Sequence, residues 1–182
     1  PGAVNDLSDG PCGPVDPLPH APGVVIMLNV DLEGLIEDCR RELDEGGFTV
    51  AALVGDELGC DWAYTIGLHR NFGHPELLVV GLDAPIAGVV LELLGERIAA
   101  GDRLDDGREL TLDGGLEFRA REVDPLFGAQ GDWFNLGREV MACWGERWPT
   151  SLQLVWSDRD QEFPQHPGDP RWSLRQPLLF SV

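Results

Sequence analysis

The sequence predicts an α+β domain with a mainly antiparallel mixed sheet, two to three packed helices and an irregular C-terminal tail. Apolar residues change several times between helical spacing and strand-like runs along the chain. Successive strand-like runs are joined by links too short for a crossover helix, which favours antiparallel pairing. The order of these segments is mixed and lacks the regular strand–helix alternation of a parallel α/β fold.

The chain of 182 residues is long enough for one complete hydrophobic core. Residues 1–26 contain six of the 14 prolines and show no apolar periodicity. Because dense proline blocks the hydrogen bonds of helices and ladders, we expect a flexible leader over residues 1–26. A single α+β domain is expected over residues 27–182.

The first half of this domain predicts one helix and three strands. Leu35, Cys39 and Leu43 recur at helical spacing, and a Gly46–Gly47 pair ends that helix. Runs of β-forming or apolar residues then predict three strands, with a turn at 56–61 and a loop at 70–75, over residues 48–54, 62–68 and 77–82.

The second half predicts two more helices and three more strands. One helix has Pro85 in its first turn and Gly101 at its C-terminal cap, and the other covers 136–148, before Pro149. A hairpin around the turn 113–115 and a last strand precede the irregular tail; the three strands span residues 109–112, 116–123 and 151–156.

The formal net charge of −19 restricts the partners of this protein. Such acidity disfavours nucleic acid and anionic lipid surfaces, whereas an acidic patch suits a cationic partner; simple solubility is the alternative reason for the charge. The longest early apolar run is too short to span a membrane, and a basic export signal is missing, so we expect a cytoplasmic protein.

The composition also bears on cofactors. The chain has no lysine, which excludes Schiff-base chemistry and a phosphate-loop lysine. A glycine-rich phosphate loop is missing too, while flavin binding without such a motif stays open, so the cofactor is unknown. None of the four cysteines forms a C-x-x-C pair.

Reactive side chains are densest over residues 62–76. His74 could act as a general base oriented by Glu76, although a histidine before a proline often only holds a turn. His69, His74 and Glu76 have the types of metal ligands, but their spacing matches no zinc signature, so no metal site is predicted. The tail is expected to close over this segment, giving the ligand-contact candidates Trp62, Tyr64, Thr65, His69, Trp156 and Gln176.

Residues 62–68 (WAYTIGL), 72–77 (FGHPEL) and 81–82 (GL) look like the signature of an uncharacterised bacterial family, the domain-of-unknown-function family numbered four-two-six-two. The tail resembles that family's closing motif at Gln153, Trp156, Asp158, Phe163, Pro164 and 176–178. The likeness covers roughly residues 30–180, and Ser157 stands where the pattern has a further proline. It implies a small bacterial cytosolic domain and no particular reaction.

Two functions follow as hypotheses. The first is an accessory protein that binds a small molecule, a peptide or a protein through a pocket near residues 62–76. Its basis is the lack of a recognisable catalytic constellation together with high acidity and six tryptophans. The second is a small enzyme of specialised metabolism in which His74 and Glu76 perform acid–base chemistry, with or without a metal.

Overall fold

The computed structural model describes residues 24–27, 31–55, 59–129, 132–158, 162–164, 166, 169–173 and 175–180. The strands are β1 (Val24–Met27), β2 (Thr49–Leu53), β3 (Trp62–Ile66), β4 (Glu76–Val80), β5 (Glu109–Thr111), β6 (Glu117–Glu122) and β7 (Ser151–Trp156). The helices are α1 (Leu32–Asp44), α2 (Leu68–Phe72), α3 (Ala84–Ala99), α4 (Pro125–Ala129) and α5 (Asn135–Ala142).

One mixed sheet holds the seven strands in the order β1-β2-β3-β4-β7-β6-β5. Four of the six neighbouring pairs are antiparallel, and only β1–β2 and β4–β7 are parallel. The predicted α+β fold with a mainly antiparallel sheet is therefore confirmed. The short links between successive strands predicted this pairing, because two parallel neighbouring strands need a long crossover connection.

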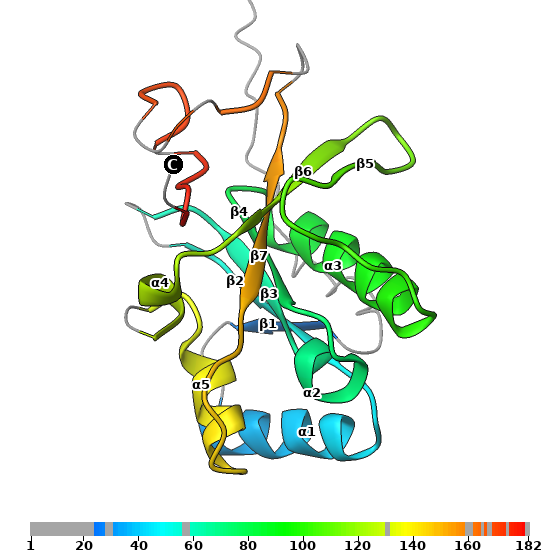
Figure 1. Cartoon of the computed structure of the whole chain (residues 1–182). Helices are drawn as coiled ribbons and strands as arrows, with labels where there is room; N and C mark the ends of the chain where they lie inside the picture. Colours follow the sequence, from blue (N-terminus) through cyan, green and yellow to red (C-terminus); the bar gives the residue numbers. More distant parts are fainter. Residues whose placement is uncertain are drawn as a thin grey trace, which may run out of the picture.

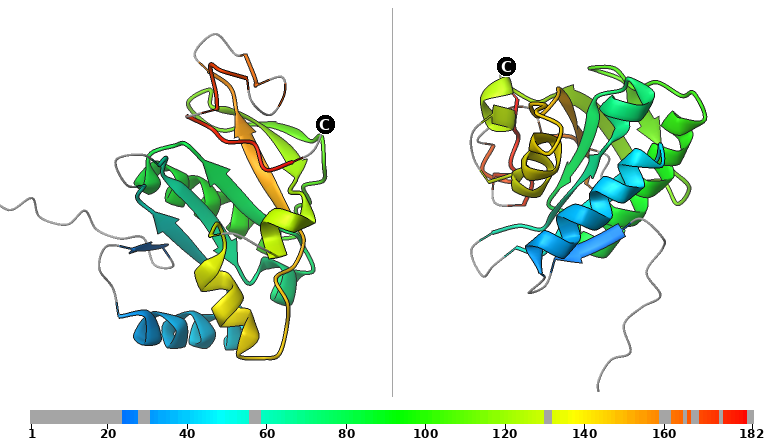
Figure 2. Two further views of the ribbon diagram at one scale, coloured as in Figure 1. Left: turned by 90° about the vertical axis from the view of Figure 1, so that its left-hand side faces the viewer. Right: turned by 90° about the horizontal axis from the view of Figure 1, so that it is seen from below.

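Helices cover both faces of this sheet (Figure 1 and Figure 2). On one face α3 buries Leu91, Leu94 and Ile98 against alternate side chains of β2, β3 and β4. On the other face α1 and α5 bury Leu43 and Val140 with their neighbours in a second core. Because side chains of a strand alternate between faces, each central strand contributes to both cores.

The sequence did not predict β1, α2 or α4. Strand β1 pairs in parallel with β2. Its partner lies about 25 residues away in the sequence, so the local pattern of residues does not reveal the pairing. The other part of the expected leader, residues 1–23, lies outside the described residues. Helix α5 ends at Ala142, earlier than the predicted end at Trp148, because Gly145 with φ 71° turns the chain before Pro149 is reached.

The start of α3 is capped from a distant loop. Asp83 makes no side-chain capping bond, and the Asp61 carboxylate instead accepts a hydrogen bond from the Ala84 amide at 2.9 Å. The other Asp61 oxygen accepts one from the Gly55 amide at 2.9 Å, and the Asp61 carbonyl accepts one from Gly81 at 2.7 Å. One aspartate therefore joins the ends of β2, β4 and α3, and satisfies a helix amide that would otherwise be unpaired.

Two glutamine side chains fasten the C-terminal tail to β7. The amide of Gln176 donates to the Trp156 carbonyl at 3.0 Å and accepts from the Trp156 amide at 2.9 Å. Gln153 in β7 does the reverse: it donates to the Pro177 carbonyl at 2.7 Å and accepts from the Leu179 amide at 2.8 Å. Each glutamine side chain thus pairs with backbone groups as a neighbouring strand would. We call these four hydrogen bonds of Gln153 and Gln176 the glutamine clasp.

The clasp brings the tail backbone against Gly81. Gly81 has φ 82°, and a Cβ at this position would overlap the carbonyl oxygen of Arg175. Glycine is therefore needed here twice, for its left-handed conformation and for the space that the tail occupies.

We expect Gly81→Ala to destabilise the protein by about 2 kcal/mol more than Gly107→Ala, because only the first substitution adds an overlap with the tail to the left-handed strain. Gly107 is the matched control, since its φ of 80° is nearly the same and a Cβ there would meet no atom within 4 Å. Urea denaturation of both variants measures the difference. If both variants lose the same free energy of unfolding, the tail backbone moves away from the added Cβ without destabilising the protein, and the expectation is wrong.

Candidate functional site

The Glu76 side chain is fully buried at the start of β4, and four donors surround its carboxylate. One oxygen accepts hydrogen bonds from the amides of Gly67 at 2.9 Å and His69 at 3.0 Å. The other oxygen accepts from the Thr65 hydroxyl at 2.6 Å and, more weakly, from the Leu68 amide at 3.3 Å. The carboxylate therefore binds the turn from β3 into α2 along its whole length.

This arrangement makes Glu76 the N-terminal cap of α2. The cap position is Gly67, with φ 112° and no side chain to accept the free amides. Burial raises the pKa of Glu76 to about 7, against the opposing effect of the four hydrogen bonds. Thr65 is also fully engaged, because its hydroxyl oxygen accepts from the Leu77 amide at 2.8 Å. The geometry gives both residues a role in holding the corner.

His74 is buried as well, and both its ring nitrogens have partners. Nδ1–H donates to the Pro75 carbonyl at 2.7 Å, and Nε2 accepts from the Leu104 amide at 3.0 Å. This pair of bonds fixes the neutral imidazole with its proton on Nδ1. Burial lowers the pKa of His74, which keeps the ring neutral at neutral pH. His74 thus connects the loop before β4 to the segment after α3.

The other ligand-contact candidates lie elsewhere. Tyr64 is buried in the second core, where its hydroxyl accepts from the Gly137 amide at 3.2 Å, and the Trp62 indole donates to the Trp133 carbonyl at 3.1 Å. His69 is exposed. Trp156 and Gln176 belong to the glutamine clasp, and Gln176 also lines a small pocket of about 180 Å³ formed by the tail.

The structure therefore corrects the expectation that the tail closes over residues 62–76 to form one cavity. Tyr64 and Thr65 are successive residues of a strand, so they point to opposite faces of the sheet. Glu76 begins β4 and the tail contact at Gly81 follows its last residue, so the two lie about 16 Å apart at the rise of a strand. Of the candidate residues, Thr65, His69 and Glu76 lie together, because the Glu76 carboxylate accepts hydrogen bonds from the Thr65 hydroxyl and the His69 amide. Their catalytic or ligand-binding roles stay predictions.

Within the described residues no group of three or more histidine, cysteine, aspartate or glutamate side chains could hold a metal ion, and His69, His74 and Glu76 form no such group. None of the helices in the described part of the chain has the length and apolar character needed to cross a membrane.

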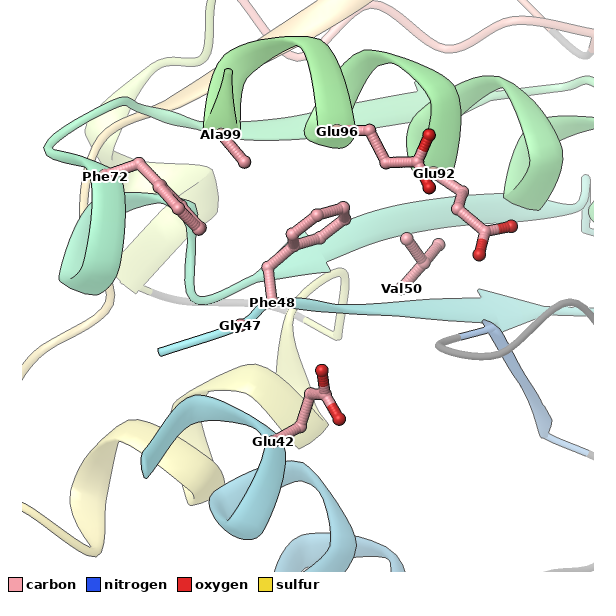
Figure 3. A pocket seen from close by; sticks show the side chains of 8 residues that line it. All are labelled: Glu42, Gly47, Phe48, Val50, Phe72, Glu92, Glu96 and Ala99. Atoms are coloured by element: carbon pink, nitrogen blue, oxygen red, sulfur yellow. The ribbon is translucent and has the colours of Figure 1, made fainter. Parts of the chain in front are cut away.

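A pocket of about 320 Å³ opens between α3, β2, α2 and the end of α1 (Figure 3). We call it the acidic pocket; its lining residues are Glu42, Gly47, Phe48, Val50, Phe72, Glu92, Glu96 and Ala99. The rings of Phe48 and Phe72 meet edge to face at a centroid distance of 6.4 Å. Figure 3 shows Glu96 and Glu92 projecting from α3, with the Glu96 carboxylate nearer the Phe48 ring and the Glu92 carboxylate above Val50, and Glu42 pointing up from α1.

The shape of the pocket depends on a glycine in α3. The Phe48 ring packs directly on the helix backbone at Gly95, where a Cβ would overlap the ring. Phe72 is the last residue of α2 and reaches the pocket from the corner that Glu76 holds. Two aromatic rings from different elements therefore form the apolar wall, while the carboxylates stand at its rim.

The electrostatic character of the pocket is strongly negative. Glu92 and Glu96 lie one helical turn apart, and burial followed by repulsion from Glu96 raises the pKa of Glu92. In the described residues none of the three pocket carboxylates, Glu42 included, takes part in an ion pair, and no arginine lines the cavity. Such a cavity attracts a positively charged group and repels an anion.

Sequence reasoning found one part of this pocket and missed the rest. Phe72 falls within the predicted segment 62–76, whereas Phe48, Glu92 and Glu96 lie outside it. A signal was present: two glutamates at i and i+4 interrupt an otherwise apolar helix, and like charges at that spacing destabilise it. Phe48 gave no signal, because its ring meets α3 only through the tertiary fold.

We expect the pKa of Glu76 to appear in the pH dependence of stability. A carboxyl with a pKa of about 7 in the folded state and 4.5 as its ordinary value keeps its proton in the folded protein while the unfolded chain loses it. The free energy of unfolding therefore falls by about 3 kcal/mol, relative to Glu76→Gln, as the pH rises from 4.5 to 7, and is constant above that range.

Urea denaturation of the natural chain and of Glu76→Gln at each pH measures this difference. The glutamine variant keeps the size of the side chain and cannot titrate, so it removes the contribution of the other carboxyl groups. A relative stability that rises with pH would show that the four donors dominate and hold the carboxylate charged.

Comparison with known proteins gives one match. Neither the curated proteins nor the solved structures contain a match to this chain. The family described as Domain of unknown function (DUF4262) matches residues 42–170. This range contains the corner at Glu76, all of α3 and strand β7, and it ends before Gln176 of the clasp. Because the match covers more than two thirds of the sequence, the chain belongs to the DUF4262 family.

Proposed function

We propose that this domain is a ligand-binding accessory protein whose acidic pocket holds a cationic group of a small molecule or peptide. The observation that carries the proposal is the lining of the pocket. Three carboxylates and two phenyl rings surround the space, and no basic side chain is among the described residues that line it. This combination is the one that recognises ammonium and guanidinium groups, through charge and through the faces of aromatic rings.

The size of the pocket limits what it holds. A volume of about 320 Å³ lies at the lower end of the range for small-molecule sites. It therefore suits one flat or compact cationic group with a short aliphatic part. In the proposed complex the phenyl rings of Phe48 and Phe72 contact the aliphatic part of the ligand, and Glu92 and Glu96 contact its charge. All four side chains line the pocket in Figure 3.

The rest of the chain supports cation binding by its charge. The net charge of −19 gives a negative field that attracts cationic ligands at a distance. The same field weakens with added salt, because exposed charges are screened within about 10 Å at 0.1 M ionic strength. Binding of this kind is therefore faster and tighter at low salt.

An acid–base enzyme that uses His74 and Glu76 is the second proposal. The pKa of about 7 for Glu76 favours it, since a carboxyl group that titrates near neutrality serves as a general acid or base. Against it stand the burial of both side chains and their complete sets of hydrogen bonds. A substrate would have to replace those bonds, so we rank ligand binding first.

The pocket proposal is tested with a pair of probes that differ in charge. Butylguanidine is expected to bind with a dissociation constant in the millimolar range, about −4 kcal/mol, and the neutral butylurea is expected to bind at least tenfold more weakly. Glu92→Gln/Glu96→Gln should weaken butylguanidine binding by about tenfold, because both nearest charges are lost. Chemical-shift changes in the phenylalanine ring signals of the isotope-labelled protein measure the affinities.

Glu33→Gln/Glu37→Gln is the matched control, since it removes two glutamates one turn apart on α1, away from the pocket lining. Because burial raises the pKa of Glu92, affinity for butylguanidine should also increase as the pH rises through that pKa. Equal affinity for the two probes, or an effect of the control as large as that of the pocket variant, would remove the proposal.

The enzyme proposal is tested by the state of His74. We expect its imidazole to stay neutral, with the proton on Nδ1, at pH values below the ordinary pKa of 6.5, because burial opposes the charged form. Nitrogen NMR of histidine-labelled protein reports both the tautomer and the pKa. An imidazole that titrates above pH 6.5 and exchanges its proton quickly with water would favour catalysis over a structural role.

A further inference from the structure

The outer face of α3 carries an exposed apolar stripe. Ile86, Val89 and Leu93 are 52%, 60% and 44% exposed, and they recur at i, i+3 and i+7, so they lie in one row along the helix. The opposite face of α3 is already buried in the core through residues such as Leu91 and Leu94. The stripe therefore adds nothing to the fold and presents apolar surface to the solvent.

This stripe lies next to the acidic pocket on the same helix. Glu92 follows Val89 by three residues, and Glu96 follows Leu93 by three, so each carboxylate neighbours a member of the stripe. Both carboxylates line the pocket, and the described residues give neither of them an ion pair. The surface of α3 thus combines an apolar row with a negative border.

We propose that α3 docks an amphipathic basic helix of a partner protein, whose apolar residues cover Ile86, Val89 and Leu93 and whose arginine or lysine side chain enters the acidic pocket. This inference rests on the proposed function, because it identifies the cationic group in the pocket as a side chain of a protein. The spacing fits, since an apolar row over two turns is what a docked helix contacts with its own i, i+3 and i+7 residues.

Charge decides between this partner and the alternatives. A second copy of the chain would bring its own Glu92 and Glu96 toward the same carboxylates, with −19 of net charge on each molecule, and the two copies would repel each other. An anionic lipid surface is repelled for the same reason. A basic helix replaces that repulsion by attraction along the side of the stripe that Glu92 and Glu96 border.

The experiment uses the full chain and a synthetic peptide of 18 residues with leucines at helical spacing and four arginines beside them, labelled with fluorescein. Fluorescence anisotropy is expected to show binding that weakens with salt. A peptide with glutamate in place of each arginine should not bind. Val89→Ser/Leu93→Ser should weaken peptide binding by at least about tenfold and leave butylguanidine binding unchanged.

Glu92→Gln/Glu96→Gln should weaken the binding of both probes. Leu126→Ser is the matched control, because Leu126 on α4 is 65% exposed and lies outside both the stripe and the pocket. The substituted positions on α3 are exposed, so the variants are expected to keep the fold, which circular dichroism verifies.

The outcomes separate the two proposals. If butylguanidine binds and the arginine peptide does not, the docking inference is overturned and the pocket proposal stands. If neither binds, both fail. Peptide binding that is insensitive to Val89→Ser/Leu93→Ser also overturns the inference. A concentration-dependent dimer in sedimentation that Val89→Ser/Leu93→Ser dissociates would assign the stripe to a second copy instead.

Discussion

The buried carboxylate of Glu76 is the interaction on which the corner of the fold and the acidic pocket both depend. It collects the amides of Gly67 and His69 and the hydroxyl of Thr65 at one point, where β3 turns into α2 and returns as β4. A five-residue helix is too short to form by itself, so its direction is set by this cap. Phe72 ends that helix, and the aromatic wall of the pocket is therefore positioned through Glu76.

The features that follow from local periodicity were predictable from the sequence. The buried row Leu35, Cys39 and Leu43 identified α1, and the strand over residues 151–156 was predicted with the bounds that β7 has. Hydrophobic spacing is a property of neighbouring residues, so it survives without knowledge of the fold. Helix α2 did not follow this rule, because its stability comes from a carboxylate that arrives from the next strand.

The candidate site shows the same limit more strongly. Glu76 and His74 were selected because their side chains titrate, yet their surroundings are backbone groups such as the amide of Leu104 and the carbonyl of Pro75. Backbone partners are invisible in a sequence, since every residue carries the same ones. The segment 62–76 therefore contains the residues that hold the corner, and Phe72 is its one residue among the described residues that line the acidic pocket.

The residues of the two motifs that resemble the family make different structural contacts. Residues 62–77 of the first motif surround the Glu76 corner, whereas its Gly81 meets Gln176 of the tail motif at the glutamine clasp, on the far end of β4. Tyr64, between them in space, packs against Phe134 and Trp148 in the second core. A pattern of residues that recurs as one signature therefore describes several separate contacts, and proximity in a motif does not imply a shared cavity.

The acidic pocket differs from these structural features because its residues oppose stability. Glu92 and Glu96 repel each other one turn apart, and burial disfavours the charge of Glu92. The chain has 13 arginines, and several of them form ion pairs on other surfaces. Among the described residues the protein therefore uses arginine to neutralise carboxylates elsewhere, but not at these two glutamates. A local arrangement that works against the fold marks a place where selection acted on something other than stability. Here that arrangement lies beside two phenyl rings and an exposed apolar row, which is why we assign binding to this side of α3.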